Sequence, residues 1–436
     1  MKKYRALVPV VLIVVMLASW YMLISNAAKI ENQYNTYLTA ARAYAKDGTK
    51  YAIENYNLAL SIKSSPELYK EIADYYKNQK NKDAYLEWCE DFLEVYPKEA
   101  LAYECLVEAY VEEGAYADCF DLIYTAQKRK ISSAYLDKVA SDLKYSHKVV
   151  SGGYEDVALY SNGFCAVSNK ERWGFVDAYG QVRIGVQYLS VSNYTQYNVA
   201  SVVDQEEAAY YIDNAGEKVL VAKGNIKSLG AYVGNVIVAK RDDDKYVYVN
   251  TKLETVFGEY DYASAMNSGV AAVKKDGKWH LINEQGAKIG NDTYLDVKVD
   301  ANNIAYNNGR AFVSKTEGKY ILVDGSGKQV GNLVFQDAEP FMGGDWAAVK
   351  LNDKWQFIDI NGKLVSDKTY AEARSASNGM AAVCIDDLWG FVDEKENVVI
   401  EPKFEDALYF NDKGSCFIKE DEKWRLLKLY RLNREG

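Results

Sequence analysis

The feature that most constrains this chain is a sequence pattern that recurs about every 35 residues from residue 148 to the C-terminus. The consensus of the copies reads aromatic-x-Asp/x-Ala, then Gly-x-Ala-Ala-Val, then Trp-x-Phe-Ile-Asp-x-x-Gly, and the clearest copies are 260–290, 335–368 and 370–403. Short alternating runs separated by glycines and Asx turns are typical of β-strands. Each copy has room for four strands but cannot bury both of its faces alone, so neighbouring copies must stack.

Two positions mark the phase of the repeat. The aromatic position of the third strand is occupied, in chain order, by Trp173, Ala209, Tyr246, Trp279, Tyr320, Trp355, Trp389 and Trp424, at intervals of 33 to 41 residues. A turn glycine lies ten residues before four of these tryptophans: Gly163, Gly269, Gly379 and Gly414. We interpret the tryptophans as a bulky layer between units and the glycines as turn formers, so both sets are structural positions.

Trp173-Gly174-Phe175-Val176-Asp177 and Trp389-Gly390-Phe391-Val392-Asp393 resemble the WG-repeat family, which is named for Trp-Gly in the third strand. The resemblance covers residues 147–432, with seven full copies and an eighth partial copy. It implies an all-β repeat domain and no defined chemistry.

The two ends of this array complement each other. The last copy lacks a fourth strand, and Lys148-Val149-Val150 precedes Tyr154 much as Val398-Val399-Ile400 precedes Phe404. The N-terminal strand can therefore complete the C-terminal unit, and closure would remove exposed sheet edges. We predict a β-propeller of about eight four-stranded units, one of them split. The alternative is an open β-solenoid.

Residues 29–146 are predicted to be helical, because apolar residues recur there at three- and four-residue steps. Ala40, Ala73 and Val107 are spaced by 33 and 34 residues, which matches a helix–turn–helix repeat. Tyr110, Gly114 and Ala126 give the segment a divergent resemblance to the tetratricopeptide family, here an α-solenoid. That resemblance implies a groove that binds a peptide or a helix.

The first 28 residues favour a membrane anchor. Lys2, Lys3 and Arg5 precede an uncharged run over 6–28, which is long enough to span a bilayer as a single helix. The leading positive charges predict a cytoplasmic N-terminus and export of the remaining chain. The alternative is a secreted protein cleaved near Ala27. Both interpretations place residues 29–436 outside the cytoplasm.

The composition excludes several kinds of chemistry. His147 and His280 are the only histidines, so zinc catalysis and triads that need an imidazole are disfavoured. The six cysteines form no CxxC pair and are expected to be buried hydrophobes, with a Cys105–Cys119 disulfide as a minor option. A net charge of −10 without a dense basic block argues against nucleic-acid binding. We expect no catalytic, metal-binding or cofactor-binding residue and no cofactor.

These observations favour a non-enzymatic, membrane-anchored, extracytoplasmic binding or scaffold protein. Its partner would be a protein or peptide, with a cell-envelope glycan as the other option. One alternative is a glycan hydrolase, which requires two carboxylates about 5–9.5 Å apart on one open face. The dense acidic stretches at 242–244 and 386–387 are expected to be solvated turns instead. A second alternative is an intracellular module attached to the membrane.

Overall fold

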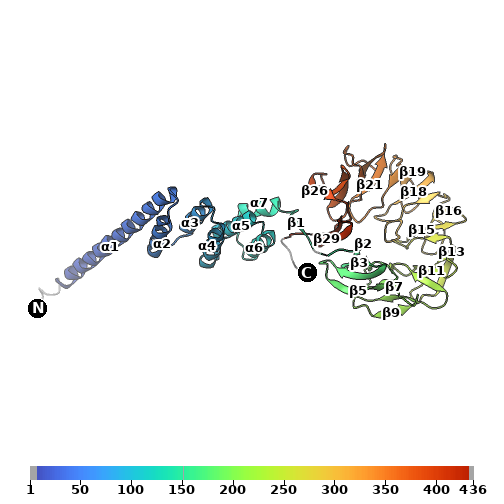
Figure 1. Ribbon diagram of the computed structural model, residues 1–436, viewed down its shortest axis with the longest axis horizontal. Coiled ribbons are helices and arrows are strands. Elements are labelled where there is room, and N and C mark those ends of the chain that lie inside the picture. Colours follow the sequence, from blue (N-terminus) through green and yellow to red (C-terminus); the bar gives the residue numbers. More distant parts are fainter. Residues whose placement is uncertain (1–6, 151, 432–436) are drawn as a thin grey trace. The chain divides into compact units, whose positions relative to one another are not determined.

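The computed structural model describes residues 7–150 and 152–431, with side chains from residue 16 onward. Two compact units are present, each with its own core. One unit holds the chain up to Ser146 together with the residues from Tyr430 onward, and the other is His147–Leu429. The first is helical and the second consists of β-sheets (Figure 1).

The helical unit contains seven helices among the described residues. They are α1 (Leu7–Lys46), α2 (Tyr51–Ile62), α3 (Pro66–Asn78), α4 (Lys82–Val95), α5 (Ala100–Glu113), α6 (Tyr116–Lys128) and α7 (Ala134–Asp142). Local chemistry sets their ends: Ser65 caps α3 by accepting from the Leu68 amide, Pro66 occupies its first turn, and Gly114 ends α5 with a left-handed backbone. The ends of α3 and α5 therefore follow from local sequence.

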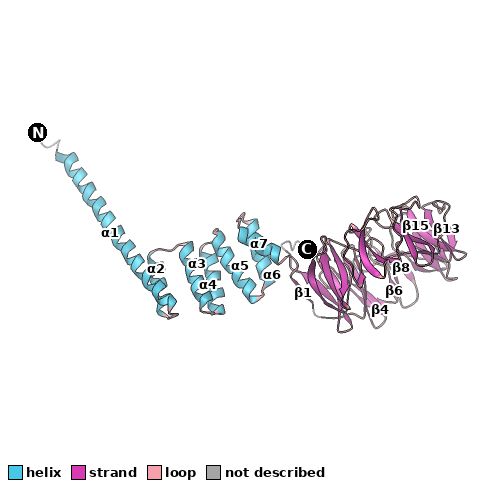
Figure 2. Cartoon of the chain, turned by 90° about the horizontal axis from the view of Figure 1, so that it is seen from above, coloured by secondary structure: helices cyan, strands magenta, loops and turns pink. Residues whose placement is uncertain are grey.

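Consecutive helices stack side by side (Figure 2). Small residues allow the close crossings: Ala52, Ala59 and Ala73 have no exposed surface. Ion pairs connect every second helix: Arg42 Nε of α1 is 2.7 Å from Glu71 Oε1 of α3, and Lys77 Nζ of α3 is 2.8 Å from Glu108 Oε1 of α5. This arrangement is compatible with the tetratricopeptide resemblance, which stays a prediction.

Among the described residues, no helix is both long and apolar enough to cross a membrane. The three basic residues of the predicted anchor, Lys2, Lys3 and Arg5, lie outside the described residues, and so do the side chains of the first half of the apolar run. The membrane anchor therefore remains a prediction.

The second unit is an eight-bladed β-propeller, with blades numbered in chain order. Blade 1 is β2 (Asp156–Ser161), β3 (Phe164–Asn169), β4 (Arg172–Asp177) and β5 (Val182–Tyr188). Blade 2 is β6 (Ser190–Val191), β7 (Ala200–Val203), β8 (Ala209–Ile212) and β9 (Lys218–Val221). Blade 3 is β10 (Ile226–Leu229), β11 (Ile237–Arg241), β12 (Tyr246–Val249) and β13 (Thr255–Tyr260).

Blades 4 to 6 have three named strands each: β14 (Tyr262–Ala263), β15 (Val270–Lys275) and β16 (Lys278–Asn283); β17 (Asp296–Val297), β18 (Ala311–Thr316) and β19 (Lys319–Val323); and β20 (Asp337–Ala338), β21 (Trp346–Leu351) and β22 (Lys354–Asp359). Their fourth strand is reduced to isolated bridges, such as Trp279 with Tyr294. Blade 7 is β23 (Glu372–Ala373), β24 (Met380–Ile385), β25 (Leu388–Asp393) and β26 (Val398–Phe404).

Blade 8 is made from both ends of the array and closes the ring. Its sheet order is β1 (His147–Val149), β29 (Lys423–Leu429), β28 (Ser415–Glu420) and β27 (Asp406–Ala407). β1 runs antiparallel to β29, with His147 opposite Leu429, and the Val150 amide donates to the Leu426 carbonyl at 2.7 Å. The predicted closed propeller with one split unit is confirmed, and the open solenoid is excluded.

The repeat positions have equivalent places in successive blades. The third-strand aromatic lies opposite a fourth-strand aromatic, as in Trp173 with Tyr188 and Trp389 with Phe404. Trp279 and Trp389 are buried, whereas Trp173, Trp355 and Trp424 are half-buried. The four turn glycines have φ between +76° and +81°, a region that favours glycine. The residues that follow the tryptophan strands also recur: the Oδ1 atoms of Asp177, Asp213, Asp324, Asp359 and Asp393 each accept two turn amides.

All six cysteines are buried and free. The minor option of a Cys105–Cys119 disulfide is therefore wrong. Both side chains are fully buried among apolar residues, but they belong to different core clusters, those of Phe92 and of Ile123.

Candidate binding site at the propeller axis

Each blade begins with its innermost strand, and in seven of the eight blades that strand is only two to four residues long. Figure 1 shows β2 on the inner side of the ring and β5 and β9 toward its outer edge. The connections between first and second strands therefore gather around the axis at one end of the propeller. Residues from all eight of these regions line two adjoining hollows of about 270 and 420 Å³.

The smaller hollow lies where blade 8 meets blade 1, and we call it the seam hollow. It is lined by 159–163 of blade 1 and 409–412 of blade 8, with Ser377 and Asn378 of blade 7, Met342 of blade 6 and Asn302 of blade 5. The larger one, which we call the insert hollow, is lined mainly by blades 2 to 5. Ser161 and Asn302 border both hollows.

The lining is rich in amide side chains and almost uncharged. It contains eight amide side chains: Asn162, Asn193, Gln196, Asn267, Asn302, Asn303, Asn378 and Asn411. Asp412 is the single carboxylate among the residues that line the two hollows, and no lysine, arginine or histidine is among them. Such walls offer hydrogen-bond donors and acceptors without selecting a charge.

Several of these amides connect one blade to the next. The Nδ2 atom of Asn162 donates to Asn198 at 2.9 Å, and that of Asn378 donates to the Phe410 carbonyl at 2.7 Å. The Nδ2 atom of Asn308 likewise donates to the Gly344 carbonyl at 2.9 Å. These three donors precede a turn glycine directly and have φ near +50°, which asparagine tolerates better than most residues.

The connection in blade 5 is the longest of the eight and carries an insertion, residues 298–310, between β17 and β18. The Oδ1 atom of Asp300 accepts the amides of Asn302 and Ile304, and its Oδ2 atom accepts from Asn307 Nδ2 at 2.9 Å. Burial raises the pKa of the Asp300 carboxyl, although these hydrogen bonds oppose the shift. The insertion is thus a folded loop that is held by hydrogen bonds between its own residues.

The tip of this loop reaches a distant blade. Asn193 of blade 2 donates from Nδ2 to Oδ1 of Asn302. Blades 2 and 5 are not neighbours in the ring, so this hydrogen bond crosses the axial region. Because Asn302 also borders both hollows, the contact lies between the seam hollow and the insert hollow.

A charged cluster supports the first strands of blades 6 to 8. Arg374 of blade 7 has Nη2 2.8 Å from Asp406 Oδ1 of blade 8 and Nη1 3.6 Å from Glu339 Oε1 of blade 6. Burial raises the pKa of the Glu339 carboxyl, and Arg374 offsets only part of that effect. Tyr409, which lines the seam hollow, hydrogen-bonds this carboxyl. The cluster fixes three adjacent blades beneath the hollow.

The candidates singled out from the sequence lie elsewhere. The aromatic positions that mark the repeat lie on the third strands and line neither hollow. Of the four turn glycines, Gly163 alone lines the seam hollow. His280 is a buried side chain of β16, and burial lowers its pKa. The 242–244 stretch is an exposed turn in which Asp243 pairs with Arg241. No group of three or more metal-ligating side chains is present in the part of the chain that the structure describes.

Sequence reasoning missed the axial amides. Two signals were present: asparagine stands directly before the turn glycine at Asn162, Asn308 and Asn378, and the interval from Trp279 to Tyr320 is the longest of the series. The first marks the donors that join blades, and the second marks the insertion.

The fold and the axial site define a closed β-propeller that follows a helical unit. Four stretches match the WG containing repeat model: residues 248–279, 322–355, 357–389 and 389–424. The chain therefore carries WG repeats within residues 248–424, which confirms the family resemblance there.

Solved structures resemble the propeller at low identity. BamB from Moraxella catarrhalis is 12% identical, with 64% of this chain and 99% of that chain covered and a TM-score of 0.44. Hsv2 from Kluyveromyces lactis is 11% identical, with 65% and 98% covered and a TM-score of 0.35. These likenesses concern the fold alone. No curated protein sequence matches the chain.

Proposed function

We propose that this protein is a non-enzymatic, extracytoplasmic binding or scaffold protein, held at the membrane by its N-terminal segment, and that its propeller binds a protein partner at the axial hollows. The observation that carries the proposal is the convergence of all eight first connections on a neutral, amide-rich surface. Sites that bind ligands are usually concave, with a few convergent polar groups, and these hollows have that form.

The lining favours binding over glycan hydrolysis. A glycosidase needs two carboxylates that flank the scissile bond, and Asp412 of the seam hollow is the single carboxylate among the residues that line the two hollows. The nearby carboxyls of Glu339 and Asp406 are engaged by Arg374, which suits a supporting role. A scaffold role also agrees with the stack of helices, since such repeats present extended surfaces to partners.

Placement outside the cytoplasm rests on the sequence. The basic residues before an uncharged run of 23 residues are the pattern of a signal-anchor or a signal peptide. Protease added to intact cells or protoplasts should degrade the chain while a cytosolic marker survives. Protection of the chain until lysis would contradict the export proposal.

Photo-crosslinking tests the binding surface. A photoreactive phenylalanine analogue is placed at Ser161, which borders both hollows, or at Asp386, in the turn between second and third strands of blade 7. Ser161 and Asp386 lie at opposite ends of the propeller strands. Discrete protein adducts at Ser161 and none at Asp386 support the proposal. Absence of adducts at Ser161, or the same adducts at both positions, contradicts it.

A further inference from the structure

Several side-chain amides near the propeller axis donate hydrogen bonds to main-chain carbonyls of the next blade. Asn267 of blade 4 donates from Nδ2 to the Tyr306 carbonyl at 2.8 Å, and the donors Asn308 and Asn378 also bond main-chain carbonyls of the next blade. The Ala265 amide in turn donates to the Asn303 carbonyl at 2.7 Å. In these contacts the side-chain amide donates to a main-chain carbonyl, whereas Asn162 and Asn193 donate to side-chain amide oxygens.

The junction of blade 8 with blade 1 departs from this pattern. Lys413 stands before Gly414, where blades 1, 5 and 7 have asparagine before the turn glycine. Asn411 is nine-tenths buried and lines the seam hollow, and its Oδ1 atom accepts the amides of Lys413 and Ser415, both at 2.9 Å. Its Nδ2 atom has no hydrogen-bond partner among the described residues. A buried donor without a partner is costly, so the site favours an acceptor from outside.

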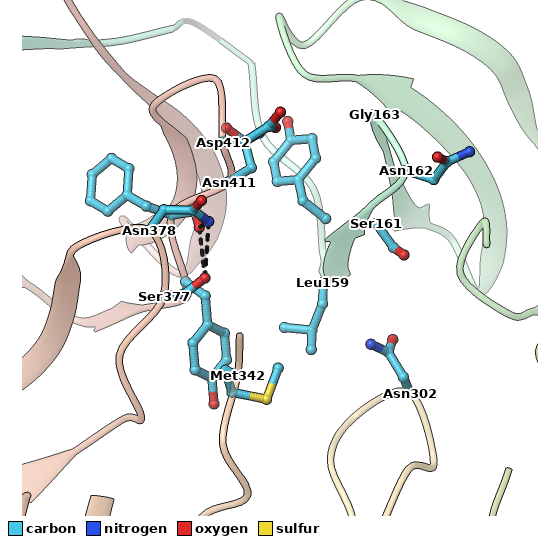
Figure 3. Close-up of a pocket in the computed structure, with 13 residues that line it drawn as sticks. Leu159, Ser161, Asn162, Gly163, Asn302, Met342, Ser377, Asn378, Asn411 and Asp412 are labelled. Carbon is cyan, nitrogen blue, oxygen red and sulfur yellow. Dashed lines mark hydrogen bonds between the residues drawn. The ribbon is translucent and has the colours of Figure 1, made fainter. Parts of the chain in front are cut away.

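Figure 3 shows how the two walls of the seam hollow face each other. Ser377, Asn378 and Asn411 lie on one side, Leu159, Ser161 and Asn162 lie on the other, and Asn302 and Met342 lie below. Blades 8 and 1 are joined beneath it by apolar packing, including the ring of Tyr160 stacked on Phe417 with centroids 5.7 Å apart. The hollow is therefore a preformed space at the closing junction, and the unpartnered Nδ2 atom of Asn411 is buried in its wall.

We propose that the seam hollow binds an uncharged polypeptide segment of the partner, and that Asn411 Nδ2 donates to a main-chain carbonyl of that segment. This rests on the proposed binding function and specifies its chemistry. A polypeptide offers one donor and one acceptor per residue, which matches walls of amides and hydroxyls. Leu159 and Met342 supply apolar surface for small side chains. An acidic segment would find no basic counter-ion in the lining, and a basic segment would find only the Asp412 carboxylate.

A saccharide fits this hollow less well. Its apolar face would need an open aromatic ring, but Phe410 is 2% exposed and packs on Phe391, with centroids 4.8 Å apart. One face of the Tyr160 ring lies against Phe417, and the hydroxyl of Tyr409 is engaged by Glu339. The aromatic surface is therefore largely used within the propeller.

The test uses phage-displayed random heptapeptides selected on the full-length chain in detergent, with the selected peptides then synthesised and titrated by fluorescence polarisation. Asn411→Asp keeps the Oδ1 acceptor of the turn and removes the donor. The matched control is Asn283→Asp, since Asn283 Oδ1 accepts two amides in the same way and five other blades carry aspartate there. Met342→Trp fills the hollow without altering Asn411.

We expect the selected peptides to be uncharged. They should bind Asn411→Asp and Met342→Trp at least tenfold more weakly than the parent, and they should bind Asn283→Asp as tightly as the parent. Thermal midpoints should show that all three variants fold. A tetramer of N-acetylglucosamine should not compete. Equal binding by the parent and both hollow variants would place the peptide elsewhere, which overturns this site while leaving the proposed function intact. Selection of no peptide, or displacement by the sugar tetramer, would overturn the peptide chemistry. Crosslinking at Ser161 decides the proposed function separately.

Discussion

The side-chain amides of Asn193 and Asn302 meet across the axial region of the propeller, although they belong to blades that are not neighbours. Asn302 lies at the tip of an inserted loop that Asp300 folds. Elsewhere blades are joined mainly to the next blade in the ring. This contact therefore couples two distant parts of the ring and separates two hollows.

A double-mutant cycle should detect this coupling. We expect Asn193→Ala and Asn302→Ala together to cost about 0.5–1.5 kcal/mol less than the sum of the single changes, because either change alone already breaks the bond. The measurement is denaturant unfolding of the full chain followed by tryptophan fluorescence. A cycle of Asn193→Ala with Asn283→Ala, which share no contact, should be additive. Additive behaviour of the first pair would mean that the contact is not populated in solution.

The junction made by β1 can be weakened at one hydrogen bond. Val150→Pro removes the amide that donates to the Leu426 carbonyl and should destabilise the propeller by roughly 1–3 kcal/mol. Hydrogen exchange at Trp424 to Leu429 should accelerate, since the pairing of β29 with its outer neighbour β1 is weakened. Val150→Thr keeps the amide and serves as the control. Unchanged exchange in that segment of Val150→Pro would show that closure contributes little.

The third-strand tryptophans should differ in their energetic contribution. Trp279 is 8% exposed and packs between blades 4 and 5, so Trp279→Ala should cost about 3–5 kcal/mol. Trp355 is half-buried, and Trp355→Ala should cost less. Unfolding midpoints and slopes of both variants provide the comparison. If Trp279→Ala melts like the parent but loses a binding partner, this tryptophan is a contact residue.

The helical unit should contain an acid-sensitive ion pair. The hydrogen bonds from Arg42, at 2.7 and 2.8 Å, lower the pKa of the Glu71 carboxyl, partly opposed by burial. A carboxyl whose pKa is lower in the folded state stabilises folding above its ordinary pKa and loses that contribution as the pH falls through the folded value. The stability difference between the parent and Glu71→Gln should therefore shrink on acidification from pH 7 to about pH 3. Glu94→Gln, at an exposed position on α4, should show no such trend. A constant difference for Glu71→Gln would refute the pair.

The number of blades and the split blade could be predicted because their signals are local and repeated. Trp389, the Asp393 turn and Gly379 recur in fixed order, and the period-2 pattern between them specifies strands. The match of Val149 and Val150 to a missing strand then needed only a comparison of the two ends. The binding surface was harder to predict. An asparagine in a turn indicates the turn itself, and whether Asn378 or Asn411 finds a carbonyl depends on where another blade lies. The long interval between Trp279 and Tyr320 indicates extra residues near Asn302, but it does not show that they extend toward the propeller axis.

The split blade has a consequence for the order in which the chain acquires its structure during synthesis. The ribosome makes β1 before every other strand of the propeller, yet its partner β29 is the last to be made. Seven blades can assemble from contiguous segments as they emerge, whereas β1 must wait with an unpaired edge until translation is almost complete. Long-range pairing of this kind slows folding and leaves the waiting edge open to association with other chains. A nascent chain truncated before Lys423 would therefore keep an open ring, however well its seven complete blades had formed.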